Sequence, residues 1–200
     1  DAAAATDLAR LDEALGGGLP RGQLSEIVGA RSSGRTALLL QVLAAATQRG
    51  EMAALVDTFD RLDVASAAAA AIDLDRLLWI RGDAGGADRA VERGLKALNL
   101  VLQAGGFGIV AIDLTDAPAS ALRGLPFTTW LRVQRTIEGS DTVCVIVGPQ
   151  PLGRSAGGLT LALAGTPRWS SLLTGFDLAA RVVSPRRQVD GHVAMAAHVR

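Results

Sequence analysis

The stretch Gly29-Ala30-Arg31-Ser32-Ser33-Gly34-Arg35-Thr36 decides the fold. It follows a short apolar run at residues 24–28 and precedes an apolar, alanine-rich segment of helix length at residues 36–47. Between a strand and a helix, the spacing GxxxxGK[ST] is typical of a phosphate-binding loop. The backbone N–H groups of such a loop and the positive N-terminal end of the helix point at phosphate oxygens. The stretch therefore predicts a nucleotide site, with the Thr36 hydroxyl as a ligand of Mg²⁺.

Arg35 stands where this motif has lysine. A planar guanidinium is bulkier than an ammonium group and prefers bidentate partners, so the exchange is not conservative. We expect nucleotide binding to be weak and hydrolysis to suffer. Lys96 is the only lysine among 20 basic residues, so a compositional preference for arginine is an alternative explanation. A glycine-rich turn that never meets a nucleotide is the alternative interpretation of the loop.

Asp113 closes a second apolar strand, at residues 107–113, about 80 residues after the loop. This is the Walker B pattern, in which a carboxylate orients the water shell of Mg²⁺. Many buried strands end in aspartate, so the indication comes from its place in the same predicted sheet. We expect Thr36 and Asp113 to be the metal ligands.

Strands alternate with helices along most of the chain, which predicts an α/β fold with a mostly parallel, twisted sheet flanked by helices. The predicted strands are 24–28, 53–56, 77–80, 107–114 and 142–147, and the predicted helices are 8–15, 36–47, 62–71, 87–103 and 120–138, the last with an irregular start at Gly124 and Pro126. Strand-like segments at 159–164, 178–183 and 192–198 predict an antiparallel C-terminal extension. We expect one domain over residues 1–200, with 8–150 as the doubly wound part and 151–200 as the extension.

Composition narrows the function classes. The formal net charge is zero, with 20 basic and 20 acidic residues, which argues against a strongly basic nucleic-acid binder. Apolar runs are shorter than a membrane span, the N-terminus does not read as a secretory signal, and Cys144 is the only cysteine. We therefore expect a cytoplasmic protein.

Residues 11–29 read LDEALGGGLPRGQLSEIVG and resemble the entry segment of RecA recombinases, LDxALGGGLPxGxxxEIxG. The resemblance covers most of residues 8–183 and weakens after about 150. It implies a RecA-like P-loop core with ATP or ADP and Mg²⁺ as ligands. It also implies that Asp63 contacts adenine, that Phe176 and Arg181 lie at a subunit interface, and that Gln150 is at the nucleotide-sensing position. Because the chain starts almost at this segment, we expect the family's N-terminal polymerisation segment and large C-terminal domain to be absent.

The same resemblance implies an eroded catalytic site. The glutamate that activates water in RecA falls at Phe59, and a phenylalanine cannot orient or deprotonate water. The tyrosine that stacks on adenine falls at Ser66. A short RecA-like core with these changes is similar to the ImuA family, also described as SulA-like or RecA-like, of bacterial damage-induced mutagenesis cassettes.

The ImuA resemblance implies a nucleoid-associated adaptor of the SOS response and translesion DNA repair that is not an enzyme. Its implied partners are ImuB, RecA and an error-prone polymerase complex. Two alternatives stay open. One is an active DNA-dependent ATPase of the RecA or RadA type, in which Asp57 or Asp60 replaces the glutamate. The other is a single-stranded DNA-binding module that uses Arg123, Arg132, Arg135 and Arg154.

Overall fold

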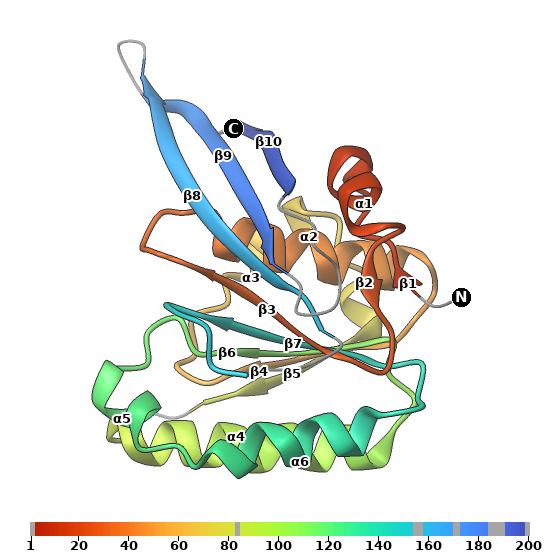
Figure 1. Ribbon diagram of the computed structural model, residues 1–200, viewed down its shortest axis with the longest axis vertical. Coiled ribbons are helices and arrows are strands. Elements are labelled where there is room, and N and C mark those ends of the chain that lie inside the picture. Colours follow the sequence, from red (N-terminus) through yellow and green to blue (C-terminus); the bar gives the residue numbers. More distant parts are fainter. Residues whose placement is uncertain (1–2, 83–84, 154–157, 170–172, 184–190, 199–200) are drawn as a thin grey trace.

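The computed structural model describes residues 3–82, 85–153, 158–169, 173–183 and 191–198 (Figure 1). The helices within these ranges are α1 (Ala9–Leu15), α2 (Arg35–Gln48), α3 (Val64–Ala69), α4 (Ala87–Ala104), α5 (Ala119–Arg123) and α6 (Phe127–Ile137), with a short 3-10 helix, η1 (Leu74–Arg76). The strands are β1 (Ala3–Ala4), β2 (Leu19–Pro20), β3 (Leu24–Gly29), β4 (Ala53–Asp57), β5 (Leu77–Arg81), β6 (Ile109–Asp113), β7 (Val143–Gly148), β8 (Thr160–Trp169), β9 (Leu173–Val183) and β10 (Gly191–His198).

The main sheet has eight strands in the order β10-β9-β8-β3-β7-β6-β4-β5. The neighbours from β8 to β5 all pair in parallel, whereas β9 is antiparallel to both β8 and β10. This confirms the predicted α/β class, a mostly parallel sheet with antiparallel strands at the end of the chain. A small β1-β2 ladder lies beside it, and the sequence patterns did not predict it.

Helices lie on both faces of the main sheet (Figure 1), and alternating residues of a strand point to opposite faces. On β4 and β6, Leu55 and Ala111 pack with α2, whereas Val56 and Ile112 pack with α4 and α6. Both faces of the central strands are therefore covered. Continuous apolar runs such as that of β7, which is buried at every position, are what a doubly covered parallel sheet requires.

Two predicted helices differ from the observed ones. The segment 120–138 forms two helices, α5 and α6, because Pro126 is extended (φ −60°, ψ 139°) and acts as the N-cap of α6. The helix expected at 62–71 shortens to α3. Its start is fixed where the Asp63 carboxylate accepts the Ser66 N–H, and it ends before Ala71, whose φ is 64°.

The first strand of the predicted antiparallel extension has two kinds of neighbour, since β8 pairs antiparallel with β9 but joins the rest of the sheet parallel to β3, which the sequence did not predict. The physical reason lies in Glu26, a buried residue of β3. Its Oε1 accepts the N–H groups of Leu152 (2.6 Å) and Gly153 (2.8 Å), and its Oε2 accepts the Thr160 hydroxyl (3.2 Å). The chain that follows β7 is thereby held across β3, and β8 starts on the far side in the same direction.

Candidate nucleotide site

The glycine-rich loop connects β3 to α2 in a tight left-handed turn. Ser32 (φ 59°) and Gly34 (φ 92°) both have positive φ, which Gly34 adopts without a steric cost. A Cβ on Gly29 would lie 2.6 Å from the carbonyl oxygen of Leu163, so β3 and β8 approach closely there. The loop therefore has the sharply folded backbone that a phosphate cradle needs.

Arg35 is the first residue of α2 and is 7% exposed. Its Nη1 and the Ser33 hydroxyl are buried, and within the described residues neither has a hydrogen-bond partner. The N-terminus of α2 has no side-chain cap, and the first N–H groups of a helix have no intrahelical acceptor. A buried guanidinium nitrogen without a hydrogen-bond partner at the N-terminus of a helix fits an anionic group such as phosphate.

A hollow of about 690 Å³ opens in front of this loop, at the carboxyl ends of β4 and β6. It is lined by Arg31, Ser32, Arg35, Thr36, Ala37, Leu39, Leu40, Leu55, Asp57, Arg61, Leu62, Asp63, Ser66, Asp113, Thr115 and Asp116. Predicted residues of the phosphate loop, of the metal pair and of the adenine contact thus meet in one hollow. Gly29, Ala30, Ser33 and Gly34 shape the loop and do not line the hollow.

Asp113 lies at the end of β6 and faces the hollow together with Thr36. Burial raises the pKa of Asp113. The N–H of Thr115, which donates to Oδ1 at 2.8 Å, acts against this rise. The negative charge of Asp57 adds to the rise, and the positive charge of Arg35 opposes it. Among the described residues, no three His, Cys, Asp or Glu side chains cluster to hold a metal ion. Thr36 and Asp113 fit Mg²⁺ only as two ligands beside phosphate oxygens and water, the way in which this ion is often held.

Asp57 is buried in the same hollow, but its carboxylate is fully engaged. Oδ1 accepts the Arg61 N–H at 2.8 Å, and Oδ2 accepts the Leu62 N–H at 2.8 Å and the Trp79 indole N–H at 3.1 Å. Asp57 therefore fixes the loop between β4 and α3. With both oxygens engaged in this way, it is poorly placed to receive a proton from water.

Asp63, for which the resemblance implied an adenine contact, and Ser66 both line the hollow. The Asp63 Oδ2 accepts both the N–H of Ser66 (2.8 Å) and its hydroxyl (2.6 Å). These two bonds lower the pKa of Asp63, and the bond from the Ser66 hydroxyl has the larger effect. Asp63 is therefore an N-cap residue of α3, and this role alone explains its position.

Phe59 and Asp60 follow Asp57 but do not line the hollow. Phe59 packs with the apolar cluster on the α4 side of the sheet. Asp60 forms a bidentate ion pair with Arg81, with both contacts at 2.8 Å, and this hydrogen bonding lowers the pKa of Asp60. Neither residue faces the place where a nucleotide phosphate would bind.

The remaining predicted residues are not brought to this hollow. Gln150 follows β7 and is exposed, and Arg181 is exposed on β9, where it pairs in register with Ala162 and His192. The backbone of Phe176 pairs with Pro167 and Ala197. Arg154 lies outside the described residues.

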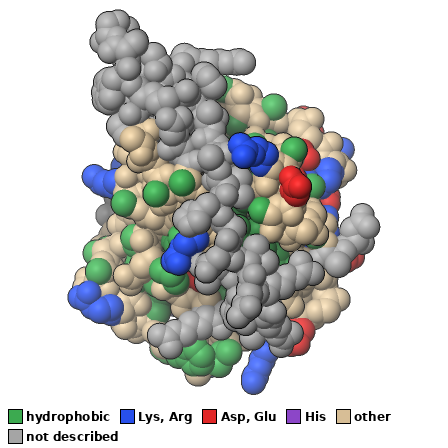
Figure 2. Space-filling view, turned by 45° about the horizontal axis from the view of Figure 1, so that its top comes forward, with side chains coloured by type: hydrophobic (Ala, Val, Ile, Leu, Met, Phe, Trp, Pro, Cys, Tyr) green, Lys and Arg blue, Asp and Glu red, His purple; other side chains and the backbone are tan. Residues whose placement is uncertain are grey.

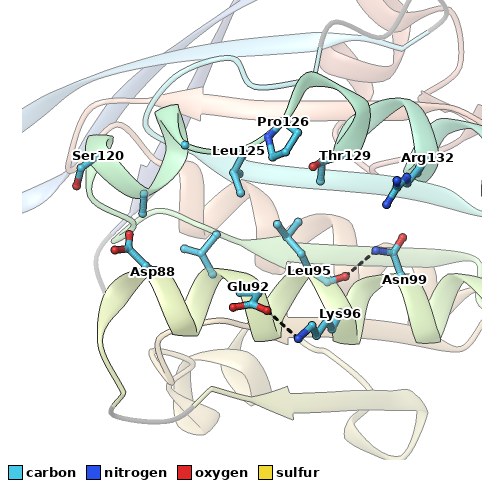
Figure 3. Close-up of a pocket in the computed structure, with 13 residues that line it drawn as sticks. Asp88, Glu92, Leu95, Lys96, Asn99, Ser120, Leu125, Pro126, Thr129 and Arg132 are labelled. Atoms are coloured by element: carbon cyan, nitrogen blue, oxygen red, sulfur yellow. Dashed lines mark hydrogen bonds and ion pairs between the residues drawn. The ribbon is translucent and has the colours of Figure 1, made fainter.

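A second groove, of about 530 Å³, runs between α4 and the α5–α6 segment on the other helical layer (Figure 3). Leu95 and Leu125 point into it, and its rim carries Asp88 and Glu92 on one side and Arg132 on the other (Figure 3). Lys96 is paired with Glu92 at 2.8 Å.

No helix in the described part of the chain is both long and apolar enough to cross a membrane.

A parallel sheet, a glycine-rich loop between β3 and α2, and an acid at the end of β6 together define the phosphate-loop class of α/β protein. More particularly, the chain belongs to the RecA family, since the family described as "RecA N-terminal domain" matches residues 2–124. The match includes the glycine-rich loop, Asp63 and Asp113.

Curated relatives agree with this assignment. The chain is 41% identical over 117 residues to Protein RecA of Methylococcus capsulatus, which covers 57% of this chain and 32% of the relative. It is 38% identical over 117 residues to Protein RecA of Symbiobacterium thermophilum, which covers 57% of this chain and 32% of the relative. It is 39% identical over 116 residues to Protein RecA of Nostoc punctiforme, which covers 57% of this chain and 31% of the relative. The matches span about a third of the length of these relatives.

Two residues of the hollow, Arg61 and Asp116, were missed by the sequence interpretation. The Arg61 Nε lies 2.9 Å from Asp116 Oδ2, and the Arg31 Nη2 lies 3.6 Å from Asp116 Oδ1. Both residues follow the carboxyl ends of neighbouring strands, β4 and β6. The general rule that ligands bind at these ends could have indicated them.

Proposed function

We propose that this chain is a RecA-like adaptor of the bacterial SOS response and translesion DNA repair that binds a nucleotide weakly and turns it over little. The observation that carries the proposal is the position of Phe59. Phe59 stands at the position where the RecA resemblance requires the catalytic glutamate. Its side chain packs on the face of the sheet that α4 covers, opposite the face that α2 covers. The hollow would thus keep a cradle for phosphate but lack an acid at the position of that glutamate.

Binding would use groups that remain in place. Arg35 supplies a buried positive charge with a free Nη1, and the loop and the first turn of α2 supply N–H groups. Thr36 and Asp113 would hold Mg²⁺ beside the outer phosphates, where the ion neutralises negative charge. Asp63 and Ser66 would border the base.

Hydrolysis would lack its base. A positioned general base typically contributes about 10² to 10⁴ in rate. Of the two acids considered as replacements, Asp57 already accepts three N–H donors and Asp60 is paired with Arg81 outside the hollow. The exchange of the loop lysine for Arg35 removes a compact charge from the phosphates as well.

The direct test is ATP turnover of the purified chain with Mg²⁺, with and without single-stranded DNA, beside a RecA recombinase as the positive control. We expect a rate at least about 100-fold below that of the recombinase, from the loss of the base alone. Turnover at a rate comparable to the recombinase would overturn the proposal.

The adaptor role includes contacts with ImuB, RecA and the error-prone polymerase complex. Support comes from the RecA family match and from Arg181, an exposed residue of β9 at a position that resembles the family's subunit interface. Immobilised chain should retain purified ImuB or RecA, and Arg181→Glu should weaken this binding, with Arg135→Glu on α6 as the exposed control. Binding of neither protein would refute the adaptor role without touching the nucleotide site.

An active DNA-dependent ATPase is the second candidate, favoured by the RecA family match over residues 2–124, which holds both phosphate-site motifs, and by 41% identity to a RecA protein over 117 residues. In that case an acid in the hollow, or Asp60 in the loop after β4, must activate water. Asp57→Asn, Asp60→Asn and Asp113→Asn should then be compared in the turnover assay. Loss of a substantial rate in one variant would support this candidate.

Single-stranded DNA binding has less support from the surface. On the face drawn in Figure 2, the described Lys and Arg side chains are scattered and do not form a continuous stripe. Arg132 borders the groove of Figure 3, but Asp88 and Glu92 face it from α4. Labelled single-stranded DNA titrated at two salt concentrations decides the matter, because phosphate contacts give a steep salt dependence.

A further inference from the structure

Asp116 lies between two arginines that come from two different loops at the hollow. Arg61, in the loop between β4 and α3, approaches Oδ2 at 2.9 Å, and Arg31, in the phosphate loop, approaches Oδ1 at 3.6 Å. All three residues line the hollow. The carboxylate thus acts as a shared counter-ion for both guanidinium groups.

These contacts are suited to exchange. The side chains of Arg31 and Arg61 are 90% and 66% exposed, and ion pairs so open to water contribute little to stability. The backbone of Arg61 is nevertheless fixed, because its N–H donates to Asp57 Oδ1 at 2.8 Å. Arg61 can therefore release Asp116 without moving its Cα.

Arg35 lies within the same electrostatic field. Burial lowers the pKa of its guanidinium, and the charges of Asp113 and Asp116 act against that change. Within the described residues its Nη1 is buried without a hydrogen-bond partner, whereas Arg31 and Arg61 both pair with the carboxylate of Asp116. Three guanidinium groups in one hollow match an anion that carries several negative oxygens, and phosphate accepts such planar groups bidentately.

We propose that Arg31 and Arg61 exchange Asp116 for the terminal phosphate of a bound nucleoside triphosphate, which makes Arg61 a specificity-determining residue for triphosphate over diphosphate. The inner phosphates lie on the loop and on Arg35. This inference rests on the proposed nucleotide binding and adds a role for two residues outside the phosphate-loop and Walker B motifs, Arg61 and Asp116. Without a nucleotide, Asp116 neutralises Arg31 and Arg61. When a triphosphate is bound, the Asp116 carboxylate repels the terminal phosphate that has taken its place beside the two arginines.

Calorimetric titration of the full chain with Mg·ATP and with Mg·ADP tests the exchange. Arg61→Gln should weaken ATP binding by about tenfold, the loss expected for one charge-assisted hydrogen-bond pair, and change ADP binding by less than about twofold. Asp116→Asn should tighten ATP binding by roughly threefold or more, because the competing carboxylate loses its charge. Arg61→Lys should recover part of the ATP affinity, since it keeps the charge without the planar fork.

Arg10→Gln and Asp141→Asn, at exposed positions that do not line the hollow, are the matched controls. Thermal melts confirm that each variant is folded before it is titrated. Equal effects of Arg61→Gln on ATP and ADP, or weaker ATP binding by Asp116→Asn, overturn this inference and leave the nucleotide site in place. Absence of binding of either nucleotide to both the native chain and Asp116→Asn overturns the proposed function together with it.

Discussion

Asp57 and Asp113 occupy matched positions at the ends of neighbouring parallel strands, β4 and β6. The carboxylate of Asp57 accepts three N–H donors, whereas burial and the charge of Asp57 raise the pKa of Asp113. One strand edge therefore carries two acids with different roles. Asp57 holds the loop that follows β4, and Asp113 faces the hollow beside Thr36 and Arg35.

Asp57→Asn should destabilise the fold by about 1 to 3 kcal/mol, because an amide nitrogen would face an N–H donor where a carboxylate oxygen now accepts it. Urea denaturation at neutral pH measures the loss. Asp141→Asn, an exposed change far from this loop, should leave the free energy of unfolding within about 0.5 kcal/mol. An unchanged stability of Asp57→Asn would show that the three N–H contacts are not needed.

Asp113→Asn should stabilise the ligand-free protein at pH 7 by roughly 0.5 to 2 kcal/mol, as is common when a functional site is relieved of a costly charge. Because the folded pKa is raised, the folded state binds this proton more tightly than the unfolded chain. The contribution of Asp113 to stability is therefore full below the unfolded pKa and is lost as the pH rises through the folded pKa. Urea denaturation at pH 7 and pH 3.5 should show the advantage of the variant shrinking in acid, and a constant difference would contradict this.

Glu26→Ala should cost about 2 to 4 kcal/mol, since it leaves the N–H groups of Leu152 and Gly153 and the Thr160 hydroxyl without their acceptor. Glu26→Gln should cost less, because one carbonyl oxygen still accepts. Hydrogen exchange at Leu152 and Gly153 locates the effect. If exchange at these two amides is equally slow in the alanine variant, Glu26 does not hold the chain after β7.

Cys144 should be inert in the folded protein. It is buried in β7, and burial raises the pKa of its thiol to about 12. The thiolate is the reactive species, so a thiol reagent at pH 8 should label it only after denaturation. Rapid labelling of the native protein would mean that β7 opens readily or is not a central strand.

Much of the fold followed from the sequence because periodicity and glycine position are local properties. The apolar runs of β3, β4, β6 and β7 and the stretch from Gly29 to Thr36 each indicate their own structure without reference to the rest of the chain. The direction of β8 did not follow, because it depends on the Glu26 carboxylate binding residues more than 120 positions later. A strand pattern contains no information about such a partner.

The candidate site was predictable to the same extent. Motif spacing predicted the loop and Asp113, and the RecA resemblance pointed to Asp63. Of these residues, Arg31, Ser32, Arg35, Thr36, Asp63 and Asp113 line one hollow. The engagement of Asp57 by Trp79 and the sharing of Asp116 by Arg31 and Arg61 depend on strand order, which brings β4, β5 and β6 together. Side chains that belong to no motif become visible only once that order is known.

The most direct measurement is calorimetric titration of the native chain and of Arg35→Met with ADP and Mg²⁺. Because Nη1 of Arg35 is buried without a hydrogen-bond partner in the described part of the chain, it can donate to a phosphate, and the native chain should bind ADP weakly. The variant should bind it about 10-fold to 100-fold more weakly still, as the loss of a hydrogen bond to a charged group implies. No heat of binding with the native chain, or equal affinity of the two proteins, would contradict the claim that this loop binds phosphate through Arg35.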